Sequence, residues 1–276
     1  MTTLNSYVTL AEYKAYVTSR GQAITTDTAD DAIITLLLRA TSRYFDTQTG
    51  RIFYPSVETR YYDVPTSRTL TLDGDLLEVI TLTKGDGVVI PSTEYNLKPK
   101  NTQPYVFIRL KDTSTYIWAT DGAGDYQDVI AVTGVWGYHH YYTNAWLNGS
   151  TLVEALDTSE TAIDVTSGSL FAVGNTVRFD NELGYISAIA TNTLTSTRAE
   201  NGSTAATHDS GEDVFIWRPM EDLKAAVLET AMQAYKRRFG AGTSNTATVT
   251  AAGVVLAPKD IPASAVDFIK TYRKYT

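Results

Sequence analysis

The apolar residues near the start of the chain recur every three or four positions, which is the period of an amphipathic helix. Thr9 and Glu12 have the spacing of a capping box, in which each side chain accepts a backbone N–H from the other residue. These signals predict a first helix over about residues 9–20. A second apolar stripe of helical period ends at Gly50, which readily takes the left-handed conformation found after a helix, so a second helix is predicted over about 27–47.

Between residues 57 and 137 the period of the apolar positions shortens to two. The runs are rich in β-branched and aromatic residues, which is typical of antiparallel strands. Asp73-Gly74 and Asp86-Gly87 favour tight hairpin turns, because both residue types tolerate a positive φ. The predicted strands of this region are 57–64, 68–72, 76–84, 94–98, 105–110 and 128–137.

The residues from 139 to 217 also carry strand-like runs separated by turn residues. The predicted strands there are 161–166, 170–180, 182–190 and 213–217. Helical periodicity returns only after Pro219, and it predicts two further helices, over about 219–239 and 261–273.

The pattern as a whole predicts an α+β fold, in which a helical bundle packs with a small antiparallel β-sheet and carries an inserted all-β domain. The core would be discontinuous and comprise residues 1–138 and 218–276. The insertion would comprise residues 139–217.

The distribution of charge gives a second reason to separate the insertion. The chain has 23 basic and 31 acidic side chains, a net charge of −8, and residues 139–217 hold ten of the acids but only two bases, Arg178 and Arg198. The whole net charge therefore belongs to this segment, as expected of a separate module. The acids could serve solubility alone, or they could repel DNA that slides past, and the sequence leaves both readings open.

Few residues are available for catalysis or metal binding. The chain has no cysteine and three histidines, His139, His140 and His208. His139 and His140 would point to opposite faces of an extended strand, which is poor geometry for a shared metal. The sequence also lacks the Gly-x-Ser-x-Gly, phosphate-loop and Gly-x-Gly-x-x-Gly motifs. We therefore expect that the protein is not an enzyme, binds no cofactor and has no metal site.

One acidic loop could in principle hold calcium. Asp121, Asp125 and Asp128 are spaced by glycines, but they lack the alternating order of ligands that tight calcium binding requires. We interpret the loop as an ordinary acidic turn. No run approaches eighteen apolar residues and the opening residues lack the features of a signal peptide, so we expect neither a membrane span nor export.

Several scattered motifs together resemble one known family. They are the opening VTLAEYKAYV, the end of the second helix at Ala40–Tyr44 followed by Thr49-Gly50-Arg51, the paired runs at Leu70–Leu72 and Leu77–Ile80, the run Glu94–Leu97, the run Ile130–Tyr138 and the helix Met220–Arg237. Their order is similar to that of the head-tail connector, or adaptor, proteins of tailed bacteriophages. The resemblance covers roughly 1–138 and 218–276, with about eighty residues inserted where the family has only a few.

The insertion itself resembles a small β module that recurs in phage structural proteins. The motifs that carry this second resemblance are Ile163–Val165, Phe171–Val177 and Arg198–His208. Such a module usually decorates other proteins, so it implies a surface or neighbour contact and not a reaction.

The adaptor resemblance implies a non-enzymatic, structural function. Connector subunits form a closed ring, commonly of twelve copies, beneath the portal protein, extend the DNA channel and join the capsid to a stopper or tail-completion protein. DNA would pass through without specific binding, no membrane would be involved, and the protein would lie in the neck of the virion after assembly in the host cytoplasm.

In related adaptors the C-terminal part docks into the portal. The resemblance therefore points to Phe268, Tyr272, Arg273 and Tyr275 as portal contacts, although these residues could instead only pack the final helix. A carbohydrate- or receptor-binding module of a phage tail is the alternative function. It is suggested by the acidic β segment and by the eighteen tyrosines, which suit exposed interfaces.

Overall fold

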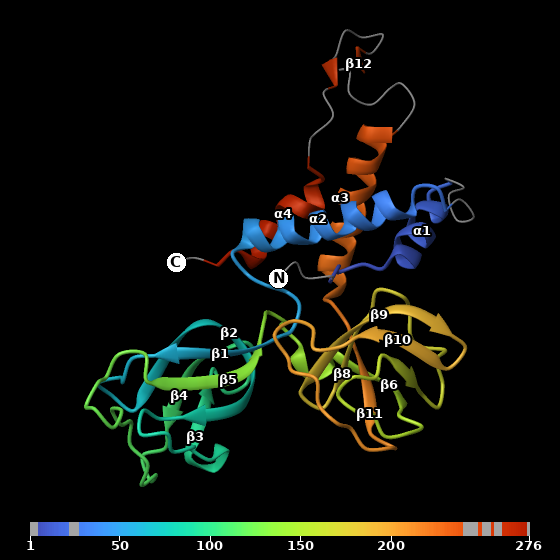
Figure 1. Cartoon of the computed structure of the whole chain (residues 1–276). Helices are drawn as coiled ribbons and strands as arrows, with labels where there is room; N and C mark the ends of the chain where they lie inside the picture. Colours follow the sequence, from blue (N-terminus) through green and yellow to red (C-terminus); the bar gives the residue numbers. More distant parts are fainter. Residues whose placement is uncertain (1–4, 22–27, 240–247, 250–254, 257–260, 275–276) are drawn as a thin grey trace.

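A layer of helices lies across two β-sheets that stand side by side beneath it (Figure 1). This computed structural model describes residues 5–21, 28–239, 248–249, 255–256 and 261–274. Strands account for 32% of the structure and helices for 25%, so the predicted helical bundle with a small sheet is wrong. The two large sheets have five and six strands over the described residues, and the protein is mostly antiparallel β.

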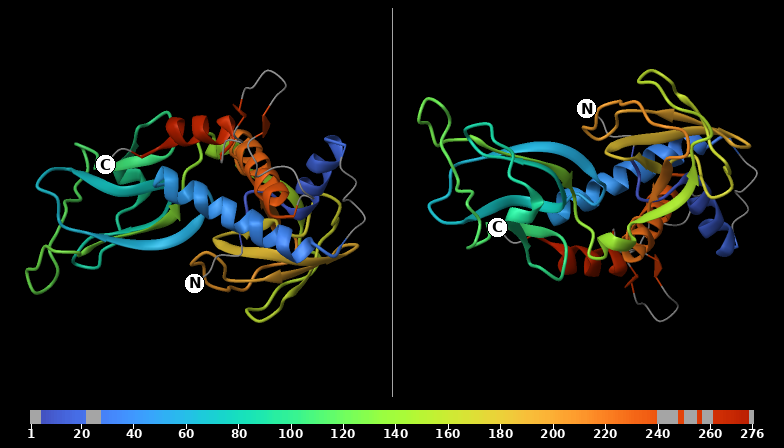
Figure 2. Two further views of the ribbon diagram at one scale, coloured as in Figure 1. Left: turned by 90° about the horizontal axis from the view of Figure 1, so that it is seen from above. Right: turned by 90° about the horizontal axis from the view of Figure 1, so that it is seen from below.

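Four helices form the upper layer within the described residues. They are α1 (Leu10–Ser19), α2 (Asp31–Thr49), α3 (Glu221–Phe239) and α4 (Ala263–Tyr272). Thr9 and Glu12 form the capping box that their spacing predicts at the start of α1, and Gly50 ends α2 with a φ of 68°. Seen from above, α2 runs over both β regions (Figure 2). No helix among the described residues is long and apolar enough to cross a membrane.

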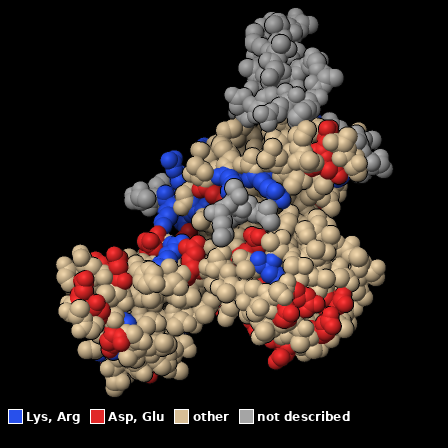
Figure 3. Space-filling model, viewed as in Figure 1, with Lys and Arg blue, Asp and Glu red and all other residues tan. Residues whose placement is uncertain are grey.

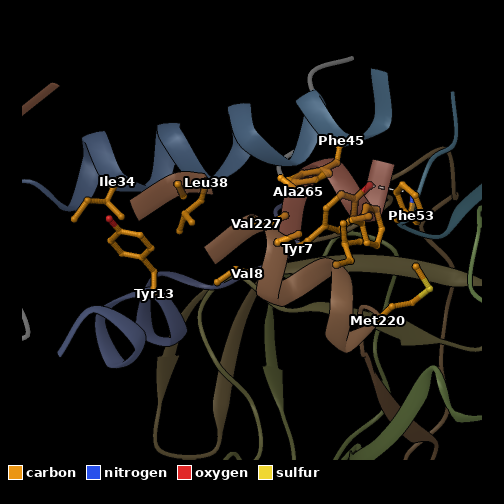
Figure 4. Close-up of a cluster of buried hydrophobic side chains, with 14 of the residues drawn as sticks. Tyr7, Val8, Tyr13, Ile34, Leu38, Phe45, Phe53, Met220, Val227 and Ala265 are labelled. Atoms are coloured by element: carbon orange, nitrogen blue, oxygen red, sulfur yellow. Dashed lines mark hydrogen bonds between the residues drawn. The ribbon is translucent and has the colours of Figure 1, made fainter. Parts of the chain in front are cut away.

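The helices share one apolar core with the segment that enters the first sheet. Phe45 of α2 and Phe53 lie in this core (Figure 4). Phe45 meets Phe268 of α4 edge to face, with 5.5 Å between the ring centroids, and the ring centroids of Phe53 and Phe268 are 5.4 Å apart. Tyr7 is also buried, and its hydroxyl donates to Asp46 and accepts the backbone N–H of Phe53. These contacts hold the ends of α2 and α4 against the start of the first sheet.

The first sheet has the strand order β1-β5-β2-β4-β3, with every neighbouring pair antiparallel. Its strands are β1 (Ser56–Tyr62), β2 (Thr69–Thr83), β3 (Tyr95–Lys98), β4 (Tyr105–Leu110) and β5 (Ile130–Trp136). A single-turn helix, Ser92–Glu94, precedes β3. The sheet encloses its own cluster of apolar side chains, which includes Leu76, Ile108, Val132 and Trp136.

The two Asp-Gly pairs of this region behave differently. Asp86-Gly87 forms the predicted turn, with a φ of 81° at Gly87. Asp73-Gly74 does not, because it lies inside the continuous strand β2, at an irregularity in the pairing with β4. Gly74 serves close packing instead, since a Cβ there would collide with the Arg60 guanidinium that covers Trp136.

The second sheet has the strand order β6-β11-β8-β9-β10-β7. Its strands are β6 (Trp146–Thr151), β7 (Ala162–Asp164), β8 (Thr176–Phe179), β9 (Glu182–Ala190), β10 (Thr193–Thr197) and β11 (Asp213–Trp217). Two of them, β6 and β10, were not predicted. A separate apolar cluster that includes Ile163, Phe179 and Val214 fills this sheet.

The separate cores explain why the predicted fold class fails. Each sheet closes around apolar side chains of its own, so neither is a minor layer that completes a helical bundle. The helices form a third cluster and lie over the sheets (Figures 1 and 2). Two short strands, β12 (Thr248–Val249) and β13 (Val255–Leu256), pair between α3 and α4.

Candidate functional site

The C-terminal helix α4 divides the predicted portal contacts into inner and outer residues. Phe268 is only 5% exposed and belongs to the helical core, so its side chain is occupied within the monomer. Tyr272 is half-buried, packs 5.5 Å from Tyr138, and donates from its hydroxyl to Asp222 at 2.5 Å. Arg273 is exposed, whereas Tyr275 lies outside the described residues. Arg273 is therefore the predicted contact that is most open to a partner.

The end of α4 is fixed to the rest of the molecule from one side. Arg51 donates to the carbonyl oxygen of Tyr272 at 2.8 Å and pairs with Asp75 of the first sheet at 2.5 Å. The backbone N–H of Lys274 donates to Thr49 at the end of α2. Because these contacts lie on the inner side, the outer face of α4 is held at the surface with a defined orientation.

The histidine pair next to this helix has a structural explanation. His139 is buried, and its Nδ1 accepts the N–H of Tyr141 at 3.0 Å, so Nε2 carries the proton and donates to the carbonyl oxygen of Arg218 at 3.1 Å. Burial lowers the pKa of His139 to about 4, which keeps the ring neutral at pH 7. His140 stacks on His139 with 5.8 Å between ring centroids, so the two rings do not point to opposite faces.

The acidic loop forms a turn that needs no cation. Asp121 accepts the backbone N–H groups of Ala123 and Asp125, each at 2.8 Å. A carboxylate that accepts two amides within its own loop is an ordinary turn arrangement.

The segment 139–217, which we call the acidic module, turns both of its arginines inward. Arg178 reaches across to the first sheet, where it pairs with Glu78 at 2.9 Å. Burial raises the pKa of Glu78, but the hydrogen bond and charge of Arg178 outweigh this and lower it overall. Arg198 is held inside the module itself. On the face seen in Figure 3, carboxylates predominate on the outer part of the module, and most of the Lys and Arg lie over the helical layer.

A buried ion-pair network holds Arg198 in place. The side chains of Arg198 and Glu182 are 5% and 1% exposed, and two N–H groups of the guanidinium reach the two carboxylate oxygens at 2.6 and 2.8 Å. The remaining guanidinium donors bond to backbone carbonyl oxygens, including that of Ala206 at 2.6 Å. The guanidinium N–H groups of Arg198 thus donate to carboxylate and carbonyl oxygens, and these hydrogen bonds compensate for the cost of burying its charge.

His208 joins this network from the other side. Its Nε2 lies 3.0 Å from Glu182, and its Nδ1 lies 2.9 Å from Glu212 and 3.9 Å from Asp180. Burial raises the pKa of Glu182, but the hydrogen bonds from Arg198, from the N–H of Ala206 and from His208 lower it overall. Glu182 is therefore a buried, ionised carboxylate.

Sequence reasoning missed this network. Part of the network could have been found from the sequence, because Arg198 and His208 both belong to the motif Arg198–His208 and Glu212 follows His208 by four residues. Nothing in the sequence indicates that Glu182, from the start of β9, lies between them.

The acidic module is also fixed to its neighbours by specific hydrogen bonds. The N–H of Val57 in β1 donates to the carbonyl oxygen of Asn201 at 2.8 Å, and the Thr176 hydroxyl donates to Asn5 at 2.6 Å. Together with the pair between Arg178 and Glu78, these bonds define its position against the first sheet and the N-terminal segment.

Comparison with known proteins adds no relative: no family model matches the chain, and no curated protein matches it.

Proposed function

We propose that the protein is a head-tail adaptor of a tailed bacteriophage. It forms a ring beneath the portal protein, extends the DNA channel and joins the capsid to the stopper or tail-completion protein. It acts through its surfaces and not as an enzyme. The proposal rests on the resemblance of residues 1–138 and 218–276 to connector proteins and on one structural observation, the inward orientation of both arginines of the acidic module.

This orientation suits a wall along which DNA slides. A protein holds DNA by neutralising phosphates with Lys and Arg, and Arg178 and Arg198 are both engaged in pairs with carboxylates. The exposed charges of the acidic module are then carboxylates, which repel phosphate. Twelve copies of a module with net charge −8 would bring 96 negative charges to the bore, screened beyond about 8 Å at physiological ionic strength.

Contacts between ring neighbours need apolar surface outside the four buried apolar clusters of the monomer. Large apolar side chains stand exposed on α2, on strands β1 and β4 of the first sheet and on its loops; they include Leu36, Tyr61, Phe107 and Ile117. A closed ring uses a head-to-tail interface in which two different patches meet, each interface burying about 1,600 Å² in total. Exposed apolar residues on several faces of the subunit suit such an interface, because each subunit contacts its two neighbours through different faces.

The portal contact is assigned to α4 and the residues that follow it. Arg273 offers an exposed charge, and the half-buried Tyr272 precedes it. Phe268 contributes indirectly by fastening the helix to the core. Tyr275 remains part of the proposal on the resemblance alone.

The alternative, a carbohydrate-binding module, has less support. Sugars pack their apolar faces on exposed aromatic rings, and Tyr141 is the one exposed aromatic among the large hydrophobic residues of the acidic module. Clear binding of residues 139–217 to a glycan array would favour this alternative.

Electron microscopy of the purified protein, alone and with its cognate portal, tests the adaptor proposal. We expect closed rings, commonly twelvefold, that bind the portal coaxially. Arg273→Glu should weaken portal binding without affecting the fold, whereas Lys100→Glu, a matched reversal of an exposed charge on the first sheet, should not. A protein that stays monomeric with its portal, or virions that assemble normally without it, would overturn the proposal.

A further inference from the structure

We propose that Asp180, His208 and Glu212 form a binding site for a divalent transition-metal ion, for which Zn²⁺ and Mn²⁺ are the best candidates. The site lies at one end of the acidic module, where the turn between β8 and β9 meets the loop before β11. This inference rests on the geometry of the module and is independent of the adaptor function.

The first argument is the spacing of the three ligand atoms. One oxygen of Asp180, one oxygen of Glu212 and Nδ1 of His208 all lie within 4.8 Å of one another. Ligands at about 2.1 Å from a metal are about 3 Å apart when they occupy adjacent octahedral positions and about 4.2 Å apart when opposite. The separations of 2.9 Å and 3.9 Å from Nδ1 fall at or between these values.

The second argument is the orientation of the His208 ring, which Glu182 holds from the side opposite to the cluster. The ring is buried, and its Nε2 faces the ionised carboxylate of Glu182 at 3.0 Å. A carboxylate only accepts hydrogen bonds, so Nε2 donates to Glu182, and Nδ1 is the ring nitrogen that faces Glu212 and Asp180. In most metal sites, a carboxylate or another acceptor that bonds to the second nitrogen of a histidine orients the ring towards the metal. Here Glu182 has this role, and Arg198 holds the Glu182 carboxylate in turn.

The third argument is the balance of donors and charge. Nδ1 of His208 and the carboxylates of Asp180 and Glu212 converge, and a metal ion would take the place of a proton between Nδ1 and Glu212. Two carboxylates carry a charge of −2, which a divalent cation neutralises. The ion would thereby connect the β8–β9 turn to the 208–212 loop.

The type of ligand selects the metal. One imidazole with two carboxylates suits Zn²⁺ or Mn²⁺, whereas Mg²⁺ and Ca²⁺ prefer sites made of oxygen alone. Three protein ligands leave further positions for water, and Asp180, whose side chain is 71% exposed, lies on the solvent side.

Isothermal titration calorimetry of the full chain with ZnCl₂, MnCl₂ and MgCl₂ tests the site. We expect one saturable site for Zn²⁺ and Mn²⁺ and much weaker binding of Mg²⁺. Asp180→Asn and Glu212→Gln should each weaken binding about tenfold or more, and both keep the volume of the side chain. Asp209→Asn, which changes an exposed carboxylate next to His208 but outside the cluster, should bind as the wild type does. Circular dichroism would verify that each variant is folded.

Two calorimetric results would overturn the inference. One is the lack of saturable Zn²⁺ or Mn²⁺ binding up to about 1 mM, a Kd that corresponds to only about −4 kcal/mol. The other is unchanged binding in the double variant Asp180→Asn/Glu212→Gln, which would place the ion elsewhere, for example at the pair His139 and His140.

Nitrogen NMR of the His208 ring supplies a second readout at a named atom. We expect the Nδ1 resonance to shift when Zn²⁺ is added, while Nε2 keeps its hydrogen bond to Glu182. An Nδ1 resonance that does not move in saturating Zn²⁺ would mean that His208 is not a ligand, which would contradict the proposed site.

Discussion

The two β-sheets of this protein differ in how deeply their charged pairs are buried. On the first sheet, pairs such as Arg109 and Asp112 lie at the surface, with 51% and 76% of the side chains exposed, and the most buried pair, Asp75 with Arg51, is still 9% and 19% exposed. In the acidic module the charged pair is buried, with Arg198 and Glu182 at 5% and 1% exposure. A module with ten acids and two bases can thus be stable when both bases pair with carboxylates and one of them, Arg198, is placed inside, where it bonds to several backbone segments.

The comparison predicts where each sheet is vulnerable. Surface ion pairs contribute about 0–1 kcal/mol, but removing one partner of a buried pair costs about 3–5 kcal/mol, because the other charge is left without compensation. The acidic module should therefore be sensitive to loss of charge, and the first sheet to changes of volume.

The largest expected effect is that of Arg198→Met. This change leaves the Glu182 carboxylate buried without its partner, so we expect the acidic module to lose about 3–5 kcal/mol. Hydrogen exchange followed by mass spectrometry should detect faster exchange in β8, β9 and β10, with β2 and β5 unaffected. Arg109→Met is the matched control, with an expected loss of no more than about 0.5 kcal/mol. Equal losses in the two variants would remove the distinction between the sheets.

The second prediction concerns volume in the first sheet. Gly134 lies in β5, and a Cβ there would collide with the carbonyl oxygen of Glu78 and with the side chain of Leu76. Gly134→Ala should therefore destabilise the first sheet by about 1–3 kcal/mol while the acidic module keeps its exchange protection. Gly122→Ala, where no atom lies within 4 Å of the new methyl group, is the control and should have little effect.

The strands and caps that sequence did predict are those with local causes. The capping box needs only Thr9 and Glu12, and the alternating apolar positions of 105–110, 182–190 and 213–217 identify β4, β9 and β11 residue for residue. Local signals also mislead. The pair Asp73-Gly74 has the composition of a hairpin turn, yet it lies within strand β2, where the Arg60 guanidinium that covers Trp136 packs against Gly74.

The fold class and the buried network could not be predicted, because both depend on distant contacts. A list of strands does not say whether a sheet completes a helical core or closes around its own, as both sheets do here. Likewise, Glu182, Arg198 and His208 come from three places in the chain, and only the pairing of the sheet brings them together. Of the predicted portal contacts, sequence alone could not separate the buried Phe268 from the exposed Arg273.

The third prediction uses pH to separate the acidic module from the helical layer. The pKa of Glu182 is lowered in the folded chain, so the ionised carboxylate stabilises the fold. This stabilisation is present at pH values above 4.5, the ordinary pKa of a glutamate, and is lost as the pH falls below that value. Asp46 has the opposite sign, because burial raises its pKa to about 6, although Arg43 and the hydrogen bond from Tyr7 oppose this. Its protonation therefore adds stability as the pH falls through 6 towards the ordinary value of 3.8.

Exchange rates measured from pH 7 to pH 3, and corrected for the intrinsic dependence on pH, test this contrast. Strand β9 should lose protection below about pH 4.5. The wild type should gain protection in α2 relative to Asp46→Asn between pH 7 and pH 5, because only the wild type can bind the additional proton. A module that keeps β9 protected at pH 3 would contradict the assigned role of Glu182.

The smallest expected effect tests the surfaces themselves. Glu154→Gln and Asp209→Asn remove exposed charges from a face that holds only carboxylates, so each should stabilise the acidic module by up to about 0.5 kcal/mol through reduced repulsion. Asp112→Asn is the same kind of change on the first sheet, but it removes the partner of Arg109 and should destabilise by a similar amount. Urea denaturation in 10 mM and 1 M NaCl would measure the change in the free energy of unfolding for each variant. These changes should disappear in 1 M salt, where the Debye length is about 3 Å. If all three substitutions shift stability in the same direction at low salt, the two sheets do not differ in their surface electrostatics, and the acidic module offers DNA no special repulsion.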